Sequence, residues 1–452
     1  MKSINPATGI IIQQYDEHSL SQCDEIVDKV FDEWQWWKQT SIAERKVLML
    51  NAAAVLRKRK GEFAKLMTLE MGKVIKESEA EVEKSAWVCD YYAEHAGQFL
   101  ADEMIESDAT KSFVSFGPLG PVLAVMPWNF PFWQVFRFAA PTLMAGNAGL
   151  LKHASNVPGC ALAIENIFRE AGFPKNLLRI LMIPGKDVEH VIRNDKVRAA
   201  TFTGSELAGS KVASAAGKYL KKTVMELGGS DPFIVLKDAN LDKCAQTAVT
   251  ARMLNTGQSC IAAKRFIVEA EVYDAFIDKV KGIISALKIG DPLDAESQFG
   301  PLARMDLLED IDRQVQESVG QGAKLELGGD RMNGEGFYYQ PTLLSGVSQS
   351  MPVFTEETFG PVMAVMQVSS SEEAIEVANN CFYGLGGSLW TEDIEKGIRI
   401  ARQIESGAVF VNGMTKSDPR LPFGGIKRSG YGRELSHYGI KEFVNIKTIV
   451  VE

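Results

Sequence analysis

The sequence predicts an α/β protein built from more than one lobe. From about residue 113 onward, short apolar runs interrupted by Gly and Pro alternate with helix-like segments, and this alternation is typical of a mostly parallel sheet. The chain has 452 residues, which exceeds what one compact core accommodates, so two or three lobes with ligand clefts between them are expected.

Each part of the chain has its own expected structure. Between residues 18 and 100, apolar residues recur at helical spacing, as at Ile42, Val47 and Leu50, so this region is expected to be helical. The expected strands of the central region are 122–126, 148–151, 178–183, 199–202, 224–227 and 233–235, with helices at 161–171, 188–192 and 208–220. Ligands of such a βαβ region bind at the carboxyl ends of its strands.

A second alternating set follows Cys260 and predicts another α/β lobe. Its segments are 264–268, 273–287, 362–365, 374–378 and 408–412. The tail, 439–451, is rich in β-branched residues and is expected to form a strand that pairs outside its own lobe. The chain contains no internal repeat and no low-complexity linker.

Composition excludes several classes of partner. Hydrophobic residues make up 46% of the chain and the net charge is −9, which argues against a nucleic-acid or anionic-membrane surface. The six cysteines are scattered without metal-ligand spacing, so neither a disulfide framework nor a metal site is expected. The sequence shows no secretory signal and no run of 18 apolar residues, and a cytoplasmic location is therefore expected.

A cysteine and a glutamate are the candidate reactive groups. Cys260 follows a glycine turn, and glycine permits the close backbone approach that can lower a thiol pKa. Glu226 precedes two glycines and could activate water as a general base. A lone cysteine is more often a small buried side chain, so the residues around Cys260 decide between the two interpretations.

Two loops of the central region are suited to a dinucleotide. Gly204, Ser205 and Gly209 follow an expected strand and open a helix, so a diphosphate could approach helix N–H groups. Such a turn is common in α/β proteins and leaves nucleotide binding open. Lys152 and Ser155 follow another strand with no carboxylate beside them, and a Lys with a Ser accommodates the 2′-phosphate that an acidic residue would repel. A surface lysine is the alternative.

A third loop offers groups for an aldehyde and for an anion. Asn129 ends a strand, and its amide could donate to a developing oxyanion. Trp133 and Arg137 lie four residues apart on one face of the helix that follows. An arginine fork is suited to a carboxylate, although an ion pair within the helix or between lobes would equally account for Arg137.

Taken together, these motifs resemble those of the aldehyde dehydrogenase superfamily over nearly the whole chain. They are, in order, Pro127-Trp128-Asn129-Phe130-Pro131, Lys152, Gly204-Ser205 with Gly209, Glu226-Leu227-Gly228-Gly229, Gly257-Gln258-Ser259-Cys260, Glu356-Glu357-Thr358-Phe359-Gly360-Pro361 and Pro422-Phe423-Gly424-Gly425-Ile426-Lys427. The resemblance implies a Rossmann-like NAD(P)-binding domain (1–103 and 122–227), an α/β catalytic domain (228–434) and a small β oligomerisation element (104–121 and 435–452), assembled as a homodimer or homotetramer.

The resemblance also implies roles for individual residues. Cys260 attacks the aldehyde, Asn129 and the Cys260 N–H hold the oxyanion, and hydride passes to the nicotinamide. Glu226 then helps water to hydrolyse the thioester. The implied cofactor-binding residues are Trp128, Lys152, Ser155, Gly204, Ser205, Gly209, Leu227, Glu357 and Phe359.

Within the superfamily, the sequence is most similar to bacterial short-type succinate-semialdehyde dehydrogenases, in segments 131–135, 151–154 and 228–232. This likeness implies that Arg137 and Ser417 bind the substrate carboxylate, with Trp133 in the same site. Ser155 stands where NAD-specific relatives carry Glu, which favours NADP, with NAD usable.

Other functions stay open at this point. A broad-specificity enzyme for uncharged aldehydes would not need Arg137. A thioesterase-like hydrolase would not need the cofactor loops, and a catalytically silent binding or structural protein would not need Cys260, Glu226 and Asn129 together. Succinate semialdehyde oxidation is the leading hypothesis.

Overall fold

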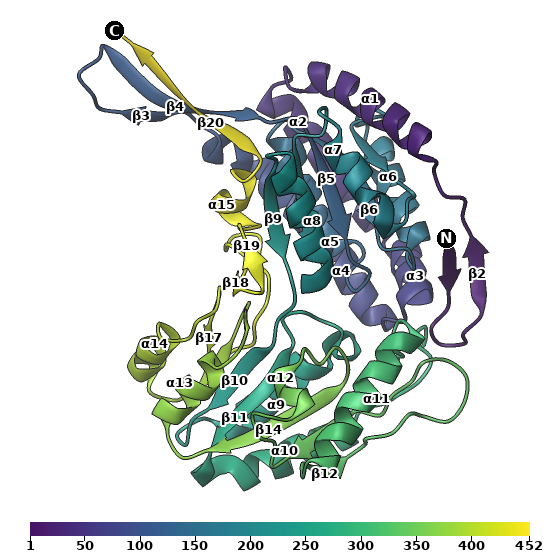
Figure 1. Cartoon of the computed structure of the whole chain (residues 1–452), viewed down its shortest axis with the longest axis vertical. Helices are drawn as coiled ribbons and strands as arrows, with labels where there is room; N and C mark the ends of the chain where they lie inside the picture. The colour runs from purple at the N-terminus through teal and green to yellow at the C-terminus, as the bar shows by residue number, and fades with distance from the viewer.

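Two β-sheets form the centre of the molecule in the computed structural model, which describes residues 1–452. In Figure 1 the six-stranded sheet lies in the upper half, the seven-stranded sheet lies in the lower half, and a narrow β arm projects at the upper left. The expected α/β class with more than one lobe is confirmed.

The N-terminal region is helical, as predicted. After a hairpin of β1 (Lys2–Ile4) and β2 (Ile11–Gln14), the chain forms α1 (Leu20–Trp37), α2 (Ile42–Lys58), α3 (Lys60–Met71) and α4 (Ile75–Phe99). Ser19 and Ser41 each accept a hydrogen bond from the third residue of their helices and complete a capping box, which satisfies N–H groups that a helix start leaves free. Gly72 ends α3 in the left-handed conformation.

The six-stranded sheet is parallel apart from one short edge strand. Its order is β19 (Gly430–Tyr431), β9 (Lys222–Glu226), β8 (Ala199–Thr203), β5 (Pro121–Met126), β6 (Ala148–His153) and β7 (Leu178–Ile180). The chain proceeds from β5 through β6 to β7 in one direction and reaches β8 and β9 in the other. The crevice between the carboxyl ends of β5 and β8 is therefore a topological switch point, where open α/β sheets bind ligands.

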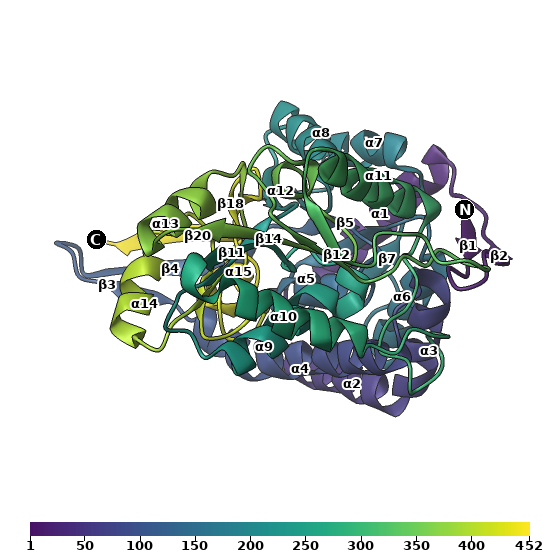
Figure 2. The same ribbon diagram turned by 90° about the horizontal axis from the view of Figure 1, so that it is seen from below.

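Helices cover both faces of this sheet. α5 (Trp133–Met144) and α6 (Pro158–Glu170) contact one face and are backed by α2, α3 and α4, while α1, α7 (Val188–Arg193, after the turn η1, Gly185–Asp187) and α8 (Glu206–Lys218) cover the other. Figure 2 shows these two layers on opposite sides of β5. The predicted central strands and helices are confirmed.

The seven-stranded sheet is also mostly parallel. Its order is β12 (Lys324–Leu327), β13 (Thr342–Ser345), β14 (Val362–Val368), β11 (Ala263–Glu269), β10 (Asp231–Val235), β16 (Ser388–Trp390) and β17 (Phe410–Val411), and only β12 is antiparallel to its neighbour. Phe233 and Val235 of β10 pack into one hydrophobic cluster and Ile234 into another, because successive strand residues point to opposite faces.

Helices again cover both faces of this second sheet. The elements are α9 (Leu241–Met253), η2 (Leu254–Gly257), η3 (Ala270–Val272), α10 (Tyr273–Ser285), α11 (Met305–Gly320), α12 (Pro352–Thr355), α13 (Ser371–Asn379) and α14 (Ile394–Ala401). α9 and α10 pack on one face, and α11, α12 and α13 pack on the other, as seen in Figure 2. β15 (Tyr383–Gly384) pairs with β18 (Ile426–Lys427) beside the sheet.

The β arm is built from both chain segments of the predicted oligomerisation element, 104–121 and 435–452. After α15 (Ser436–Ile440), β20 (Val444–Val451) pairs antiparallel with β4 (Lys111–Pro118), which also pairs with β3 (Glu103–Ile105). The tail is thus a strand that pairs outside both large sheets, as predicted, while the domain boundaries stay a prediction. No helix combines the length and the apolar character needed to cross a bilayer.

Candidate active site

Cys260 lies between η2 and β11, on a turn with an unusual backbone. Asn255, Thr256 and Gly257 all have φ between 54° and 74°, a left-handed conformation that costs about 1–3 kcal/mol for each residue other than glycine. A Cβ on Gly257 would lie 2.3 Å from the carbonyl oxygen of Gly360, so only glycine fits there. The turn is held in place by its neighbours, which fixes the position of the cysteine.

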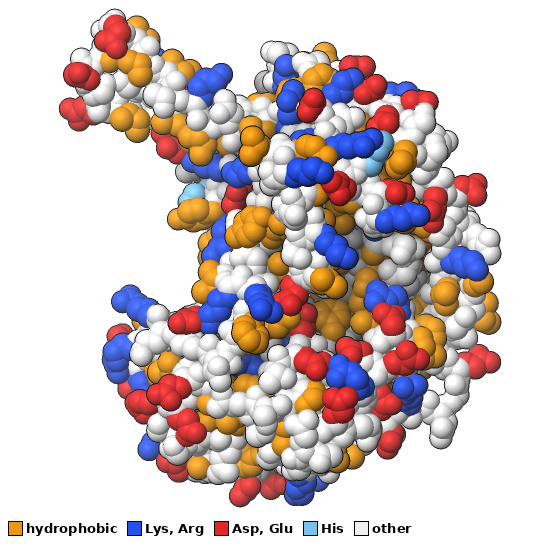
Figure 3. Space-filling view, viewed as in Figure 1, with side chains coloured by type: hydrophobic (Ala, Val, Ile, Leu, Met, Phe, Trp, Pro, Cys, Tyr) orange, Lys and Arg blue, Asp and Glu red, His pale blue; other side chains and the backbone are white.

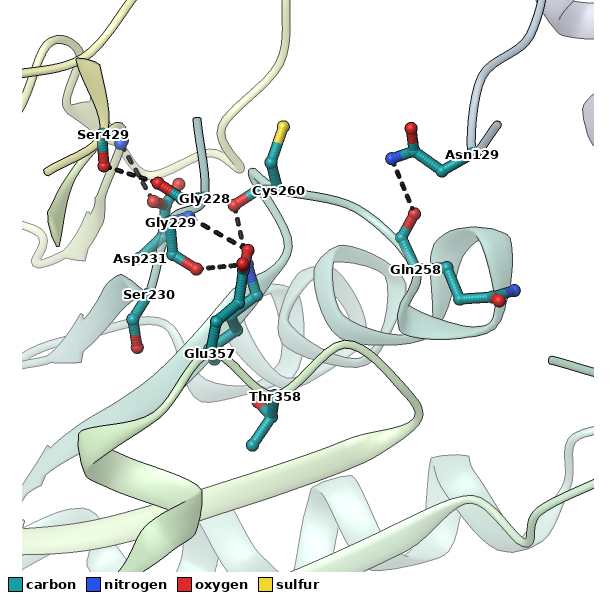
Figure 4. A network of polar contacts seen from close by, with 12 residues as sticks. Asn129, Gly228, Gly229, Ser230, Asp231, Gln258, Cys260, Glu357, Thr358 and Ser429 are labelled. Atoms are coloured by element: carbon teal, nitrogen blue, oxygen red, sulfur yellow. Dashed lines mark hydrogen bonds and ion pairs between the residues drawn. The ribbon is translucent and has the colours of Figure 1, made fainter. Parts of the chain in front are cut away.

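Lys264 stabilises this turn through hydrogen bonds from its side chain. Its buried ammonium donates to the carbonyl oxygens of Gly229 and Cys260 and lies 3.0 Å from Oε1 of Glu357. The same Glu357 oxygen accepts from the backbone N–H of Gly229 at 3.0 Å. Figure 4 shows the resulting cluster, with the Cys260 sulfur pointing away from Glu357. The sequence analysis missed Lys264, although a lysine inside an apolar strand was a signal for it.

Asn129 and Cys260 each keep one N–H donor that the rest of the chain does not use. The Asn129 side-chain nitrogen donates to the Gln258 carbonyl at 3.1 Å (Figure 4), and the Asn255 side chain donates to the Asn129 carbonyl at 2.8 Å. The Asn129 amide has a second N–H, and the backbone N–H of Cys260 donates to no protein acceptor. Donors held in this way are suited to an oxyanion on a carbon attached to the cysteine sulfur.

One face of α4 contacts all three loops of this site. Glu77, Glu81 and Lys84 follow one another at helical spacing. Oε2 of Glu77 accepts from the Asn255 N–H at 3.0 Å, and Oε1 of Glu81 accepts from the N–H groups of Phe132 and Trp133 at 2.9 and 3.0 Å. Glu81 also pairs with the buried Lys73. Burial raises the pKa of Glu77 to about 7.

Lys84 completes the α4 face by donating to Oγ of Ser417 at 2.8 Å. None of these three α4 residues was identified from the sequence. Charged residues on the buried face of a helix were a signal, because such groups are rarely buried without partners.

The environment of Cys260 favours the protonated thiol over the thiolate. Burial raises its pKa to about 12, although Lys264 and Arg137 act in the opposite direction. No adjacent base contacts the sulfur. The six cysteines are all free, and Cys260 is one of two that are partly exposed. The thiolate must therefore form when the site binds its ligands, through charges or dipoles that they bring.

Glu226 lies at the end of β9, between the two sheets. Both of its carboxyl oxygens are buried without a hydrogen-bond partner, and a Cβ on Gly424 would lie 2.7 Å from Oε1. Burial, followed by the nearby carboxylate of Glu434, raises the pKa of Glu226 well above its usual range. The cavity beside Cys260 does not include Glu226, so the predicted base is near the site and is not in contact with the sulfur.

A cavity of about 170 Å³ opens beside Cys260. Its lining residues come from α4, α5, the cysteine turn and the loop after β17: Lys84, Phe130, Trp133, Gln134, Arg137, Ala251, Leu254, Ser259, Cys260, Ile261, Ala262, Met414, Thr415, Lys416, Ser417 and Phe423. The structure thus brings together Cys260 and all three predicted substrate residues. Apolar walls with a few polar groups are typical of a small-molecule site.

Arg137 forms an ion pair between lobes, one of the interpretations that the sequence left open, while its binding of a substrate stays a prediction. It is 2% exposed, its Nε pairs with Glu434, 297 positions away in sequence, and its guanidinium stacks on the Phe423 ring at 4.6 Å. Nη2 lies on the same edge of the guanidinium as Nε and is buried. Nη1, on the other edge, makes no hydrogen bond within the chain and is not among the buried polar atoms without a partner, so this edge is available to an anion in the cavity.

The predicted cofactor residues do not line the cavity beside Cys260. Trp128 and Phe359 make an edge-to-face contact with ring centroids 5.8 Å apart. Gly204 and Ser205 lead into α8, whose N-cap makes no side-chain hydrogen bond, and its first N–H groups are free to bind a diphosphate. A Cβ on Gly209 would lie 2.3 Å from the Leu227 side chain, so glycine lets α8 approach the sheet.

Lys152 and Ser155 lie at the carboxyl end of β6. The Lys152 ammonium has no ion-pair partner, and burial lowers its pKa. Ser155 is exposed and lines a surface depression that also contains Lys2 and Glu17. An unpaired lysine and a hydroxyl at this strand end fit a phosphorylated ribose, although Glu17, which the sequence analysis did not consider, brings a carboxylate to the same depression.

Comparison with known proteins decides the family. The family model described as "Aldehyde dehydrogenase family" matches residues 1–449. The chain belongs to the aldehyde dehydrogenase family. A probable NADP(+)-dependent succinate-semialdehyde dehydrogenase of Synechocystis sp. is 53% identical over 447 residues, which cover 99% of this chain and 98% of that protein. The corresponding enzyme of Mycobacterium ulcerans is 48% identical over 451 residues, with 99% and 98% covered.

The solved structures agree with this assignment. The crystal structure of succinic semialdehyde dehydrogenase from Streptococcus pyogenes, in complex with NADP+, superimposes with a TM-score of 0.98 at 37% identity and covers 100% of this chain and 99% of that one. The predicted aldehyde dehydrogenase fold and enzyme class are thereby confirmed, and an aldehyde is the expected substrate of this family member.

Proposed function

We propose that this aldehyde dehydrogenase oxidises succinate semialdehyde to succinate and uses NADP in preference to NAD. The observation that carries the proposal is the position of Arg137 and Ser417 in the cavity that also contains Cys260. A guanidinium nitrogen without a partner and a hydroxyl group can bind a carboxylate, while the sulfur meets an aldehyde at the other end of a short substrate. The relatives named for succinate semialdehyde and NADP(+) support this assignment.

The chemistry is assigned to residues of this chain. Cys260, once ionised, attacks the aldehyde carbon, and the oxyanion of the thiohemiacetal is held by its own backbone N–H and by the Asn129 amide. The bound cofactor supplies the hydride acceptor. Glu226 takes a proton from the water that attacks the thioester, which releases the acid. Glu226 does not line the cavity beside Cys260, so its side chain must rotate towards the thioester for this step, and burial, which raises its pKa, favours transfer of the proton from water to its carboxylate.

The cofactor is assigned to the crevice at the switch point of the six-stranded sheet. Trp128 and Phe359 would border the nicotinamide, with Glu357 holding its ribose, and the start of α8 with Leu227 would hold the diphosphate. Lys152 and Ser155 would hold the phosphorylated ribose. The absence of an acidic residue at position 155 supports NADP, because a carboxylate there would repel the 2′-phosphate.

Steady-state kinetics test the proposed function. The kcat/KM for succinate semialdehyde is compared with that for butyraldehyde, which has the same number of carbons and no carboxylate. A preference of about 10²-fold or more, which corresponds to about 3 kcal/mol in the transition state, supports the carboxylate site. Near-equal values would leave an aldehyde dehydrogenase of broad specificity. Measuring NADPH against NADH formation in the same assay tests the cofactor.

We also propose that the protein is a cytoplasmic homodimer or homotetramer that associates through the arm. β20 is an edge strand of the arm sheet, and the arm exposes large apolar side chains, among them Met104, Ile105, Ile446 and Val450. Figure 3 shows hydrophobic side chains, in orange, on the surface of the arm at the upper left. An exposed edge strand with apolar residues is suited to pairing with a second copy. Six free cysteines fit a reducing compartment. Light scattering of the wild type and of I446K, in which a monomer is expected, tests this assembly.

A further inference from the structure

Two lysines, Lys84 and Lys416, line the cavity beside Cys260, and neither the sequence motifs nor the proposed chemistry uses them. Lys84, on the inner face of α4, lies 4.2 Å from the centre of the Trp133 ring and donates to Oγ of Ser417. No carboxylate lies within 4.0 Å of its ammonium, whereas the nearby Lys73 pairs with Glu81. A largely buried ammonium without a counter-ion is costly, so this position calls for an explanation.

The charges around the cavity do not balance. Lys84, Arg137 and the exposed Lys416 line it, and no acidic residue does. Arg137 pairs with Glu434, and Glu81, one turn before Lys84 on α4, pairs with Lys73. Asp418 follows Ser417 in sequence, but its carboxylate is held by Arg420 through two side-chain hydrogen bonds. The ammonium of Lys84 is therefore left without an ion-pair partner in the wall of the cavity, and a bound anion would compensate its charge.

The Lys84 contact also orients the hydroxyl group of Ser417. Because the ammonium has no acceptor, the Ser417 oxygen must accept in this contact, and the hydroxyl proton is free to point elsewhere. Lys84, Ser417 and the Arg137 guanidinium then present only donors to the same small cavity. Three donors, two of them charged, form a suitable site for the two oxygens of a carboxylate.

We propose that Lys84 is a substrate-binding residue that contacts the carboxylate of the substrate together with Ser417 and Arg137, and so determines the preference for an acidic aldehyde. This inference rests on the proposed function, because it assigns a further contact to the same substrate. A purely structural role, in which Lys84 only ties the loop at Ser417 to α4, is the competing explanation.

Two substitutions and one control test this role. K84M removes the charge with little change in volume, and K84R keeps the charge. The wild type, K84M, K84R and K76M, whose lysine is exposed on the same helix, are assayed with succinate semialdehyde and with butyraldehyde. K84M is expected to lower kcat/KM for the acidic aldehyde by about tenfold or more beyond its effect on butyraldehyde, because a hydrogen bond between two charged groups is lost. K84R is expected to restore most of the preference.

The double variant K84M/S417A separates direct contact from tethering. If Lys84 binds the carboxylate itself, K84M still raises the KM for succinate semialdehyde in the S417A background. If Lys84 acts only through Ser417, the second substitution adds nothing, and the proposal is overturned. An equal loss for both aldehydes in K84M would overturn it as well. If K84M does not fold, K84Q, which keeps a donor to Ser417 without the charge, is assayed in its place.

The assays distinguish an error in the proposed function from an error in the role assigned to Lys84. A wild type that shows no preference for succinate semialdehyde over butyraldehyde contradicts the proposed function. A wild type that does show the preference, together with a K84M variant that keeps it in full, contradicts only the role of Lys84.

Discussion

Arg137 and Glu434 form a buried ion pair at the edge of the cavity that contains Cys260. The two side chains are 2% and 7% exposed, and Nη1 of Arg137, on the edge away from Glu434, makes no hydrogen bond within the chain and is not among the buried polar atoms without a partner. Glu434 therefore fixes the guanidinium in place while leaving donor capacity for a ligand. The pair also connects α5 of the six-stranded sheet to the segment that returns from the seven-stranded sheet.

Removing Glu434 is expected to destabilise the protein. E434A leaves the Arg137 charge buried and unpaired, which costs about 3–5 kcal/mol in comparable cases. E189A, which breaks the exposed pair of Glu189 with Lys218, is the matched control and should cost less than about 1 kcal/mol. Denaturant unfolding gives the free energy of unfolding of both variants. Equally small decreases in the two variants would show that the Arg137 charge does not need Glu434 as its partner.

Replacing Glu226 is expected to slow hydrolysis of the thioester and not its formation. E226Q should lower kcat by about 10²- to 10⁴-fold, the usual range for a general base, while a first turnover of reduced cofactor still appears as a burst. Quenched-flow measurement with succinate semialdehyde detects the burst. Loss of the burst together with the steady rate would assign Glu226 to an earlier step.

The difference in stability between E226Q and the wild type is predicted to depend on pH. The folded-state pKa of Glu226 is raised by burial, so the native state binds a proton that the unfolded chain releases above about pH 4.3. Stability contributed at this site therefore falls as pH rises above that value. E226Q should have a higher melting temperature than the wild type at pH 8 and the same one at pH 4. A lower melting temperature at pH 8 would contradict the buried, neutral carboxyl.

Alkylation of Cys260 is expected to depend steeply on pH. Because the thiol pKa is raised to about 12 in the free protein, the reaction rate with iodoacetamide should rise through pH 9.5 without reaching a plateau. Mass spectrometry of the peptide that contains Cys260 follows the rate, and Cys381, the other partly exposed cysteine, serves as an internal reference. A plateau near pH 8 would indicate a thiolate that is already stabilised in the free protein.

Glu77 is expected to hold the cysteine turn. E77A removes the acceptor for the Asn255 N–H and should lower kcat by about tenfold or more, since small displacements of reacting groups have effects of this size. E77Q keeps an acceptor oxygen and should retain most of the activity. The control is E79A, because Glu79 lies two residues after Glu77 on α4 and points to a different side of the helix. Equal activity of E77A and E77Q would show that this hydrogen bond does not position the turn.

The fold was largely readable from the sequence because buried parallel strands appear as continuous apolar runs between glycines. The loops with Asn129, Gly204 and Cys260 were predicted for the same reason, since each follows or precedes such a strand. Lys84, by contrast, contacts a residue 333 positions away. No local pattern states which distant loop a helix will face, so its partner could be known only from the three-dimensional structure.

The pairing of Arg137 with Glu434 could not be predicted from the sequence for the same reason. The sequence indicated that an arginine lies on the helix after Asn129, but it left open whether that arginine binds a substrate or another side chain. The structure shows that the guanidinium meets an acidic partner with Nε and that the same residue lines the cavity beside Cys260, a combination that neither single alternative described.

The most direct test of carboxylate recognition is the ratio of kcat/KM for succinate semialdehyde to that for butyraldehyde in the wild type and in R137M. Recognition through Arg137 predicts a ratio of about 10² or more in the wild type and a fall of at least about tenfold in R137M, because a charge-assisted contact is lost. An R137M variant that folds normally and keeps the full wild-type ratio would contradict it.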